Sequence, residues 1–389
     1  MRRVAISTIS AYYLLSNVGS FLQHFALRKV LKALGYAPFR VIEASRSYGR
    51  WGRVREALYD VMRPTYWWLK RLPNRRAAVV ALRFRKRRER GFRRDFEHLI
   101  GRFDEAQPFD EETVGIRGGD QVLCPDSDYK WLERVKAGNP LITYAVSTDW
   151  FGNGNEPGWR RVVGERLKRF TAVGIREQVG VEIVRELVPD QVPICHVLDS
   201  VMLLNQADYR AIQSPRAQFR KPTLFCYLVN IRETADLPLA QLKALAKALG
   251  CDLRFCGIQG AEQFIPKTLQ TIYSPRTFLR ALDDAAFFIT NSYHGSALAL
   301  LYRKSFLSIW QHDLPGRNQN QRQKELMFEF GLESRWMDYR ADAVVWQARL
   351  LEPVDWTAVE AKLQSRRAFS LAWLKAALAP DGSAEECQC

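Results

Sequence analysis

The sequence predicts an α/β protein built from two Rossmann-like halves that face each other across a cleft. Short apolar runs alternate with amphipathic helical patterns, an order typical of parallel sheets covered by helices on both faces. This alternation stops over residues 203–222, which resemble a linker, and then starts again. A chain of 389 residues is long enough for two domains with separate cores. We therefore place a first domain at residues 1–205 and a second at 206–389.

In the first half, a strand at residues 2–8 leads into a helix over residues 21–34. The apolar side chains of that helix keep helical spacing, and Gly35 follows it as a typical C-terminal residue. Residues 50–105 form a mostly helical insertion, broken at Pro64 and Pro73. The remaining elements of this half are strands at 113–124, 141–148, 171–177 and 193–199, with helices that begin near Trp159 and at Val179.

The second half repeats the pattern. Its strands are expected at residues 222–229, 251–258, 285–290 and 305–310, and its helices at 237–250, 276–285, 296–303 and 321–332. A last amphipathic helix is expected at about 357–378. No GxGxxG motif follows the first strand and no P-loop occurs, so the sequence supports neither a nicotinamide dinucleotide nor a P-loop nucleotide site.

Composition narrows the class of protein further. The apolar content of 47% and the charged content of 26% are those of a globular domain. Apolar runs are too short for a membrane-spanning helix, and the hydroxyl residues near the N-terminus favour a strand over a signal peptide. Seven cysteines without zinc spacing favour a reducing cytoplasm, and no metal or cofactor is expected.

The net charge of +16 is concentrated in one segment. Residues 53–94 hold 15 Lys and Arg against three acids, and the aromatic cluster Tyr66, Trp67 and Trp68 lies among them. Such charge favours an anionic partner, and the interleaved aromatic rings favour a membrane surface over nucleic acid. The alternative is a solvated helix face. The alternating strands and helices contain no nucleic-acid recognition module, which disfavours nucleic acid as the partner.

Residues 290–306, TNSYHGSALALLYRKSF, place polar side chains where a predicted buried strand ends and an apolar helix begins. Ligands of open α/β sheets bind outside the carboxyl ends of the strands, so His294 is a candidate functional residue. The alternative for His294 is capping or packing. His24 is a second-tier candidate near the same predicted cleft.

Several segments together resemble the polysaccharide pyruvyl transferase family. They are the turn at 290–306, residues 17–36 (NVGSFLQHFALRKVLKALGY), RGGDQVL, TYAVS, GIREQVGVEIVREL, HVLDSVMLL, and Arg322 with RQKELMFEFGL. The resemblance covers most of the chain outside residues 45–95. Asn291, Gly119, Ser305 and Ser200 depart from the residues that are common in the family.

The resemblance implies transfer of pyruvate from phosphoenolpyruvate onto two hydroxyls of one sugar, as a ketal. It implies His294 as the proton donor to the enol ether. It makes Asp120 a candidate general base, with a turn or helix N-cap as the alternative. The residues expected to bind substrate are Arg232, Arg322, Arg176, Ser292, Gly295, Ser296, Asn17 and Gln121. Surface roles are the alternative for the arginines.

Two other functions stay open at this point. A nucleotide-sugar glycosyltransferase shares the two-domain, GT-B-like architecture, and fold alone does not identify the donor. A non-catalytic assembly factor would use the basic segment only to dock at a membrane. The expected partners are phosphoenolpyruvate, a saccharide acceptor on a lipid carrier, and an anionic membrane surface. The expected location is the cytoplasm, peripheral on the inner membrane. The acceptor sugar and the oligomeric state are not set by the sequence.

Overall fold

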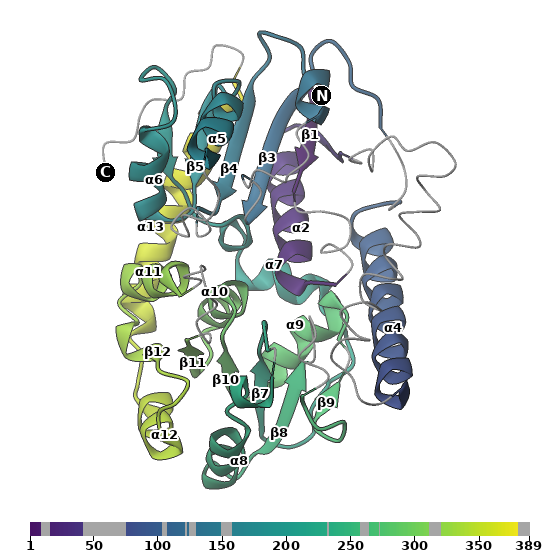
Figure 1. Cartoon of the computed structure of the whole chain (residues 1–389), viewed down its shortest axis with the longest axis vertical. Coiled ribbons are helices and arrows are strands. Elements are labelled where there is room, and N and C mark those ends of the chain that lie inside the picture. The colour runs from purple at the N-terminus through teal and green to yellow at the C-terminus, as the bar shows by residue number, and fades with distance from the viewer. Residues whose placement is uncertain are drawn as a thin grey trace.

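A computed structural model describes residues 1–8, 16–41, 75–102, 107–120, 123, 130–148, 158–231, 233–256, 264–271, 273–310 and 320–379. Two six-stranded sheets dominate the molecule, one from each half of the chain (Figure 1). All strand pairings in the described residues are parallel. The predicted α/β fold class with two Rossmann-like sheets is therefore confirmed. The domain boundary near residue 205 and the cleft stay predictions.

The first sheet has the order β2-β1-β3-β4-β5-β6. Its strands are β1 (Arg3–Ser7), β2 (Ala37–Arg40), β3 (Val114–Asp120), β4 (Leu141–Val146), β5 (Ala172–Ile175) and β6 (Ile194–His196). The helices of this half are α2 (Val18–Ala33), α4 (Arg75–Leu99), α5 (Trp159–Leu167) and α6 (Gln178–Arg185), with 3-10 turns η1 (Lys130–Arg134) and η3 (Ser200–Leu203). The strand order changes direction between β1 and β3, which is the flavodoxin-like pattern.

The second sheet has the order β12-β11-β10-β7-β8-β9. Its strands are β7 (Thr223–Tyr227), β8 (Asp252–Cys256), β9 (Gln270–Thr271), β10 (Phe287–Thr290), β11 (Phe306–Ile309) and β12 (Trp336–Met337). Numbered within its own half, this is the Rossmann order 3-2-1-4-5-6, with the change of direction between β7 and β10. Its helices are α7 (Gln206–Ile212), α8 (Leu239–Ala248), α9 (Pro275–Asp284), α10 (Tyr293–Leu301), α11 (Gln321–Glu329), α12 (Ala343–Leu351) and α13 (Trp356–Ala377), with 3-10 turns η4 (Thr234–Asp236) and η6 (Glu333–Arg335).

Some short elements differ from the sequence-based expectation. The segment interpreted as a linker contains α7, which begins with a capping box between Asn205 and Asp208. Strand β2 has four residues and includes Pro38, which is tolerated because β2 lies at the sheet edge. Elements β12 and α12 were also not predicted. The last helix is found at Trp356–Ala377, close to the expected 357–378.

One apolar core joins the two halves. The largest cluster of buried side chains contains strand residues of both sheets, together with residues of α2, α9, α10 and α13. Two smaller clusters lie one in each half. Helix α13 returns from the second half to the first (Figure 1). There, Trp373 packs on Gly174 of β5.

The described part of the basic insertion is helix α4, which lies along one side of both halves in Figure 1. Its buried face contains Arg88, Phe92, Asp95 and Phe96. The Asp95 carboxylate accepts a hydrogen bond from Arg276 N, in the first turn of α9, at 3.0 Å. Residues 53–74 of the basic segment lie outside the described residues. Among those that are described, no helix has the length and apolarity needed to cross a membrane.

Candidate functional site

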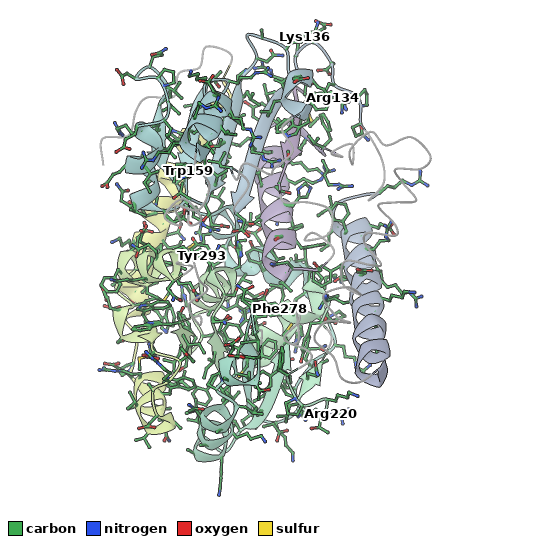
Figure 2. All side chains as sticks on the ribbon, in the orientation of Figure 1. Arg134, Lys136, Trp159, Arg220, Phe278 and Tyr293 are labelled. Carbon is green, nitrogen blue, oxygen red and sulfur yellow. The ribbon has the colours of Figure 1, made fainter. Side chains whose placement is uncertain are left out.

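The two points at which strand order changes direction each present polar residues. Asp120 ends β3 in the first sheet, and the Thr290–His294 turn follows β10 in the second. Figure 2 shows Tyr293 between the two sheets, whereas Lys136 and Arg220 lie at opposite ends of the molecule. Because ligands of open α/β sheets bind at such points, this region is the candidate site.

Side-chain hydrogen bonds fix the turn between β10 and α10. Thr290 Oγ1 donates to Tyr227 O at 2.7 Å and accepts from Ser292 N at 3.1 Å. Asn291 accepts from Val229 N at 2.7 Å and donates to Val229 O at 2.9 Å. A carboxylate could accept here but could not donate, so the amide suits this position. Ser292 caps α10, with its hydroxyl oxygen 3.4 Å from Gly295 N.

Gly295 and Ser296 have packing roles in this turn. A Cβ on Gly295 would lie 2.3 Å from Thr290 Oγ1, so only glycine lets α10 approach β10 this closely. Ser296 is fully buried, with its hydroxyl 2.9 Å from Ser308 Oγ and 3.2 Å from Ser292 O. The sequence assigned both residues to donor binding, and their contacts favour support of the turn.

His294 is buried at the head of α10, only 5% exposed. Its Nε2 lies 3.5 Å from Asp199 Oδ2, longer than an ordinary hydrogen bond. Among the described residues this nitrogen has no hydrogen-bond partner. On its other side the ring meets Gly19 of α2, where a Cβ would lie 2.3 Å from His294 Nδ1. The ring is thus held between the two halves with one nitrogen available.

Asp199 lies next to His294. Its Oδ2 accepts from Gln23 Nε2 at 2.7 Å and from Arg176 Nη1 at 3.0 Å, and its Oδ1 accepts from Val201 N at 2.9 Å. Burial by itself would raise the pKa of Asp199, but His294 and Arg176 outweigh burial and hold that pKa well below its usual range. Asp199 is therefore ionised at neutral pH.

Arg176 follows β5 and connects three carboxylates. It contacts Asp199, donates from Nε to Glu177 Oε1 at 3.0 Å, and places Nη2 3.7 Å from Asp120 Oδ1. Its guanidinium lies 4.0 Å from the ring centroid of Tyr293. Nη2 has no hydrogen-bond partner among the described residues. Arg176 and His294 therefore both bring an unused donor to this region.

Asp120 holds an arginine from the other half. Arg322 Nη1, at the start of α11, donates to Asp120 Oδ1 at 3.1 Å. Asp120 has a φ of 49°, which is unfavourable for a residue with a Cβ and is often found at functional sites. Burial would raise the pKa of Asp120, but Arg322, Arg176 and His294 outweigh it and lower that pKa. A carboxylate with a lowered pKa is a weaker base.

The structure brings together His294, Asp120, Arg176 and Arg322 from the predicted set. Asn17 instead caps α2, with its Oδ1 3.3 Å from Ser20 N. Arg232 and Gln121 lie outside the described residues. No group of three His, Cys, Asp or Glu side chains in the described ranges could hold a metal ion.

Sequence reasoning missed the roles of Gly19, Gln23, Glu177 and Asp199. Glu177 accepts from Ser147 Oγ at 2.8 Å and from Thr148 N at 2.9 Å, in addition to Arg176. All four missed residues lie inside the segments that carried the family resemblance, which was the available signal.

The substitution Gly19→Ala is expected to displace His294, because the new Cβ would overlap the imidazole at 2.3 Å. We expect a loss of about 1–3 kcal/mol in the free energy of unfolding, as for other overpacked positions. Gly91→Ala, in α4, is the matched control, since the new Cβ would lie 3.3 Å from Ser274 Cβ and meet no other neighbour within 4 Å in the described residues. Thermal unfolding of both variants tests this, and equal stability of the two would contradict the close approach.

A sequence-family model described as "Polysaccharide pyruvyl transferase" matches residues 17–313. A search of curated proteins finds no significant match.

Several solved structures are similar to the chain. A putative UDP-N-acetylglucosamine 2-epimerase from Listeria monocytogenes is 10% identical over 100% of both chains, with a TM-score of 0.48. Spinosyn rhamnosyltransferase SpnG is 12% identical, covering 97% of this chain and 99% of its own, with a TM-score of 0.43. MurG from Acinetobacter baumannii is 11% identical, covering 96% and 98%, with a TM-score of 0.39.

Proposed function

The chain belongs to the polysaccharide pyruvyl transferase family, and from this premise we propose that it moves pyruvate from phosphoenolpyruvate onto two hydroxyls of a sugar. The sugar belongs to a bacterial envelope polysaccharide or its lipid-linked precursor, and the product is a ketal. One observation carries the proposal: two buried nitrogens, each near a carboxylate, lack hydrogen-bond partners in the described residues. Arg176 Nη2 lies 3.7 Å from Asp120 Oδ1, and His294 Nε2 lies 3.5 Å from Asp199 Oδ2. Buried donors of this kind require an explanation, and an anionic ligand supplies one.

Phosphoenolpyruvate, the pyruvyl donor, would bind by displacing the Asp120 carboxylate from Arg322. The Asp120 carboxylate forms an ion pair with Arg322 and lies near Arg176. The two arginines therefore stabilise negative charge at the position of this carboxylate. Arginine side chains bind phosphate and carboxylate groups in a bidentate manner. A phosphate group that takes the place of the Asp120 carboxylate would accept a hydrogen bond from Arg176 Nη2. The N-terminus of α10 adds a favourable dipole for the same negative charge.

His294 then delivers a proton to the methylene carbon of the donor. The C2 carbon becomes cation-like, and the first sugar hydroxyl forms a bond to it and loses its proton. The bond from C2 to the phosphate oxygen breaks, and the second hydroxyl closes the ketal ring. Of the two hydroxyl protons, one restores His294 and the other leaves with inorganic phosphate. Asp199 keeps the imidazole oriented and offsets its positive charge.

Asp120 fits the role of general base only after this exchange. While it is paired with Arg322, its lowered pKa makes it a weak base. Loss of that ion pair would raise its proton affinity at the moment the sugar hydroxyl needs a base. The arrival of the donor would thereby activate the residue on the acceptor side.

The basic segment, residues about 53–94, would dock the enzyme on an anionic membrane surface that carries the acceptor. Four exposed cations of α4 support this: Lys86, Arg87, Arg90 and Arg94. Arg88 is buried and belongs to the packing face. Each engaged cation contributes about 1 kcal/mol near an anionic leaflet. If exchanging the four for glutamine leaves retention on anionic vesicles unchanged, α4 is not the anchor.

Thermal unfolding with millimolar phosphoenolpyruvate tests donor binding. A ligand at a hundredfold its dissociation constant stabilises the folded state by ~2.7 kcal/mol. We expect this stabilisation in the native protein and its loss in Arg322→Ala. Arg340→Ala is the control, since Arg340 is exposed and pairs with Asp338. Stabilisation by a nucleotide sugar but not by phosphoenolpyruvate would contradict the proposal and favour a glycosyltransferase.

A further inference from the structure

A pocket with several cationic side chains lies along β2, the edge strand of the first sheet. Its volume is about 480 Å³, within the size range of small-molecule sites. Five of its lining residues are cationic, and none of the described residues that line it carries a carboxylate. The five are Arg3, Arg28, Lys32, Arg40 and Arg102. None of the candidate site residues that the structure describes lines this pocket.

Aromatic rings form part of its wall and hold two of the guanidinium groups. Arg3 lies 4.8 Å from the ring centroid of Phe39, and Arg40 lies 5.8 Å from that of Phe96. Rings in these positions orient the guanidinium groups and add no negative charge of their own. The pocket therefore combines oriented cations with apolar surface.

Three of the five cations, Lys32, Arg102 and Arg28, pair with no carboxylate in the described residues. The Lys32 and Arg102 side chains are exposed and make no hydrogen bond or ion pair there. Arg28 donates to Pro38 O, and its buried Nε has no hydrogen-bond partner in the same part of the chain. Arg3 Nε lies 3.7 Å from the carboxylate of Asp110, which is half exposed. Such a cluster of like charges favours an anion.

The pKa of His24, a buried residue of α2, is also affected by the positive charge of this pocket. Burial, and then the charges of Arg40 and Arg28, lower the pKa of His24 to about 3. Its Nδ1 lies 3.3 Å from Thr8 Oγ1, and its ring stacks on Phe96. The imidazole is therefore neutral at physiological pH and adds no charge of its own.

We propose that this pocket binds the phosphate or diphosphate group of a phosphorylated ligand. Arginine forks match phosphate oxygens, and the rings of Tyr36, Phe39 and Phe96 offer apolar surface to the rest of the ligand. Helix α2 carries both this pocket and part of the candidate site. Lys32 and Gln23 are separated by roughly 14 Å along the helix axis, so the two sites are distinct. The proposal does not depend on pyruvyl transfer.

Titration calorimetry of the full chain with inorganic diphosphate tests this site. We expect binding that weakens as ionic strength rises, and at least a tenfold loss of affinity in the double variant Lys32→Gln/Arg102→Gln. The control with the same charge change is Lys243→Gln/Lys247→Gln, on the exposed face of α8. That control is expected to keep native affinity, and any diphosphate binding that Arg322→Ala removes belongs to the donor site. Absence of binding, or equal binding by the pocket variant, overturns the proposal.

The source of the phosphate is settled by vesicles of phosphatidylcholine with and without a polyprenyl diphosphate. Retention that requires the diphosphate lipid, and that is lost in Lys32→Gln/Arg102→Gln, supports a lipid-borne ligand. Calorimetric binding without such retention supports a soluble phosphorylated ligand. Equal retention of the native and pocket-variant proteins overturns the lipid source. The Arg322→Ala result separates failure of this site from failure of the donor site.

Discussion

The substitution His294→Gln is expected to lower the rate of pyruvyl transfer by about 10²–10⁴-fold, the usual contribution of a general acid. The glutamine amide can form hydrogen bonds but cannot deliver a proton at neutral pH. Because the arginines are unchanged, the dissociation constant for phosphoenolpyruvate, measured from the thermal stabilisation, should stay within a few fold of the native value. The measurement is phosphate release with a sugar acceptor, with kcat and KM determined separately. The loss should appear in kcat.

His98→Gln provides the control for this variant, since His98 is exposed on α4 and outside the site. Native activity in His294→Gln would remove the proton donor from the mechanism. Full cellular function after His294→Ala would go further and favour a non-catalytic assembly factor. Loss of phosphoenolpyruvate binding together with activity would instead assign His294 to donor binding.

The substitution Arg176→Met is expected to destabilise the fold by about 3–5 kcal/mol, the cost of removing one partner from a buried ion pair. Arg176 is 4% exposed and faces Asp199, Glu177 and Asp120. Without the guanidinium, the buried carboxylate of Asp199 loses a cation and a hydrogen bond. The measurement is the denaturant dependence of unfolding.

Arg160→Met is the matched control. Arg160 also pairs with a carboxylate, Glu186 at 2.6 Å, and lies over an aromatic ring, Trp159. Both partners of that ion pair are more than half exposed, so its loss should change stability by about 1 kcal/mol or less. Equal effects of the two substitutions would mean that Arg176 is not part of a buried charge network. Arg176→Lys should recover only part of the loss, because an ammonium lacks the fork geometry.

Most of the fold could be predicted because long elements have a strong hydrophobic pattern. Helices α2 and α13, and strands such as β4, combine regular apolar spacing with clear ends. The missed elements are short, and their patterns carry little information: β2 has four residues and β12 has two. Helix α7 was hidden by its polar composition, because its capping box, not an apolar stripe, defines where it begins.

The site was harder to predict, because its geometry depends on contacts between distant residues. Gln23 meets Asp199 across 176 positions, and Asp120 meets Arg322 across 202. The resemblance supplied His294, Asp120, Arg176 and Arg322, but spacing along the chain could not show which carboxylate lies under the imidazole. Nor could it show that Ser296 is committed to Ser308 inside the fold.

Helix α13 imposes an order on how the protein matures during synthesis. Strand β6 completes the first sheet at His196, yet Trp373, which packs against Gly174 and Tyr144, comes far later in the chain. Leu198 N likewise waits for Ser370 Oγ, its acceptor at 2.9 Å. At about 5–20 residues per second, the ribosome needs on the order of 10–35 s to make the intervening segment. For that interval the nascent first half carries an uncovered apolar face, so the chain reaches its native state only once its own C-terminal helix emerges.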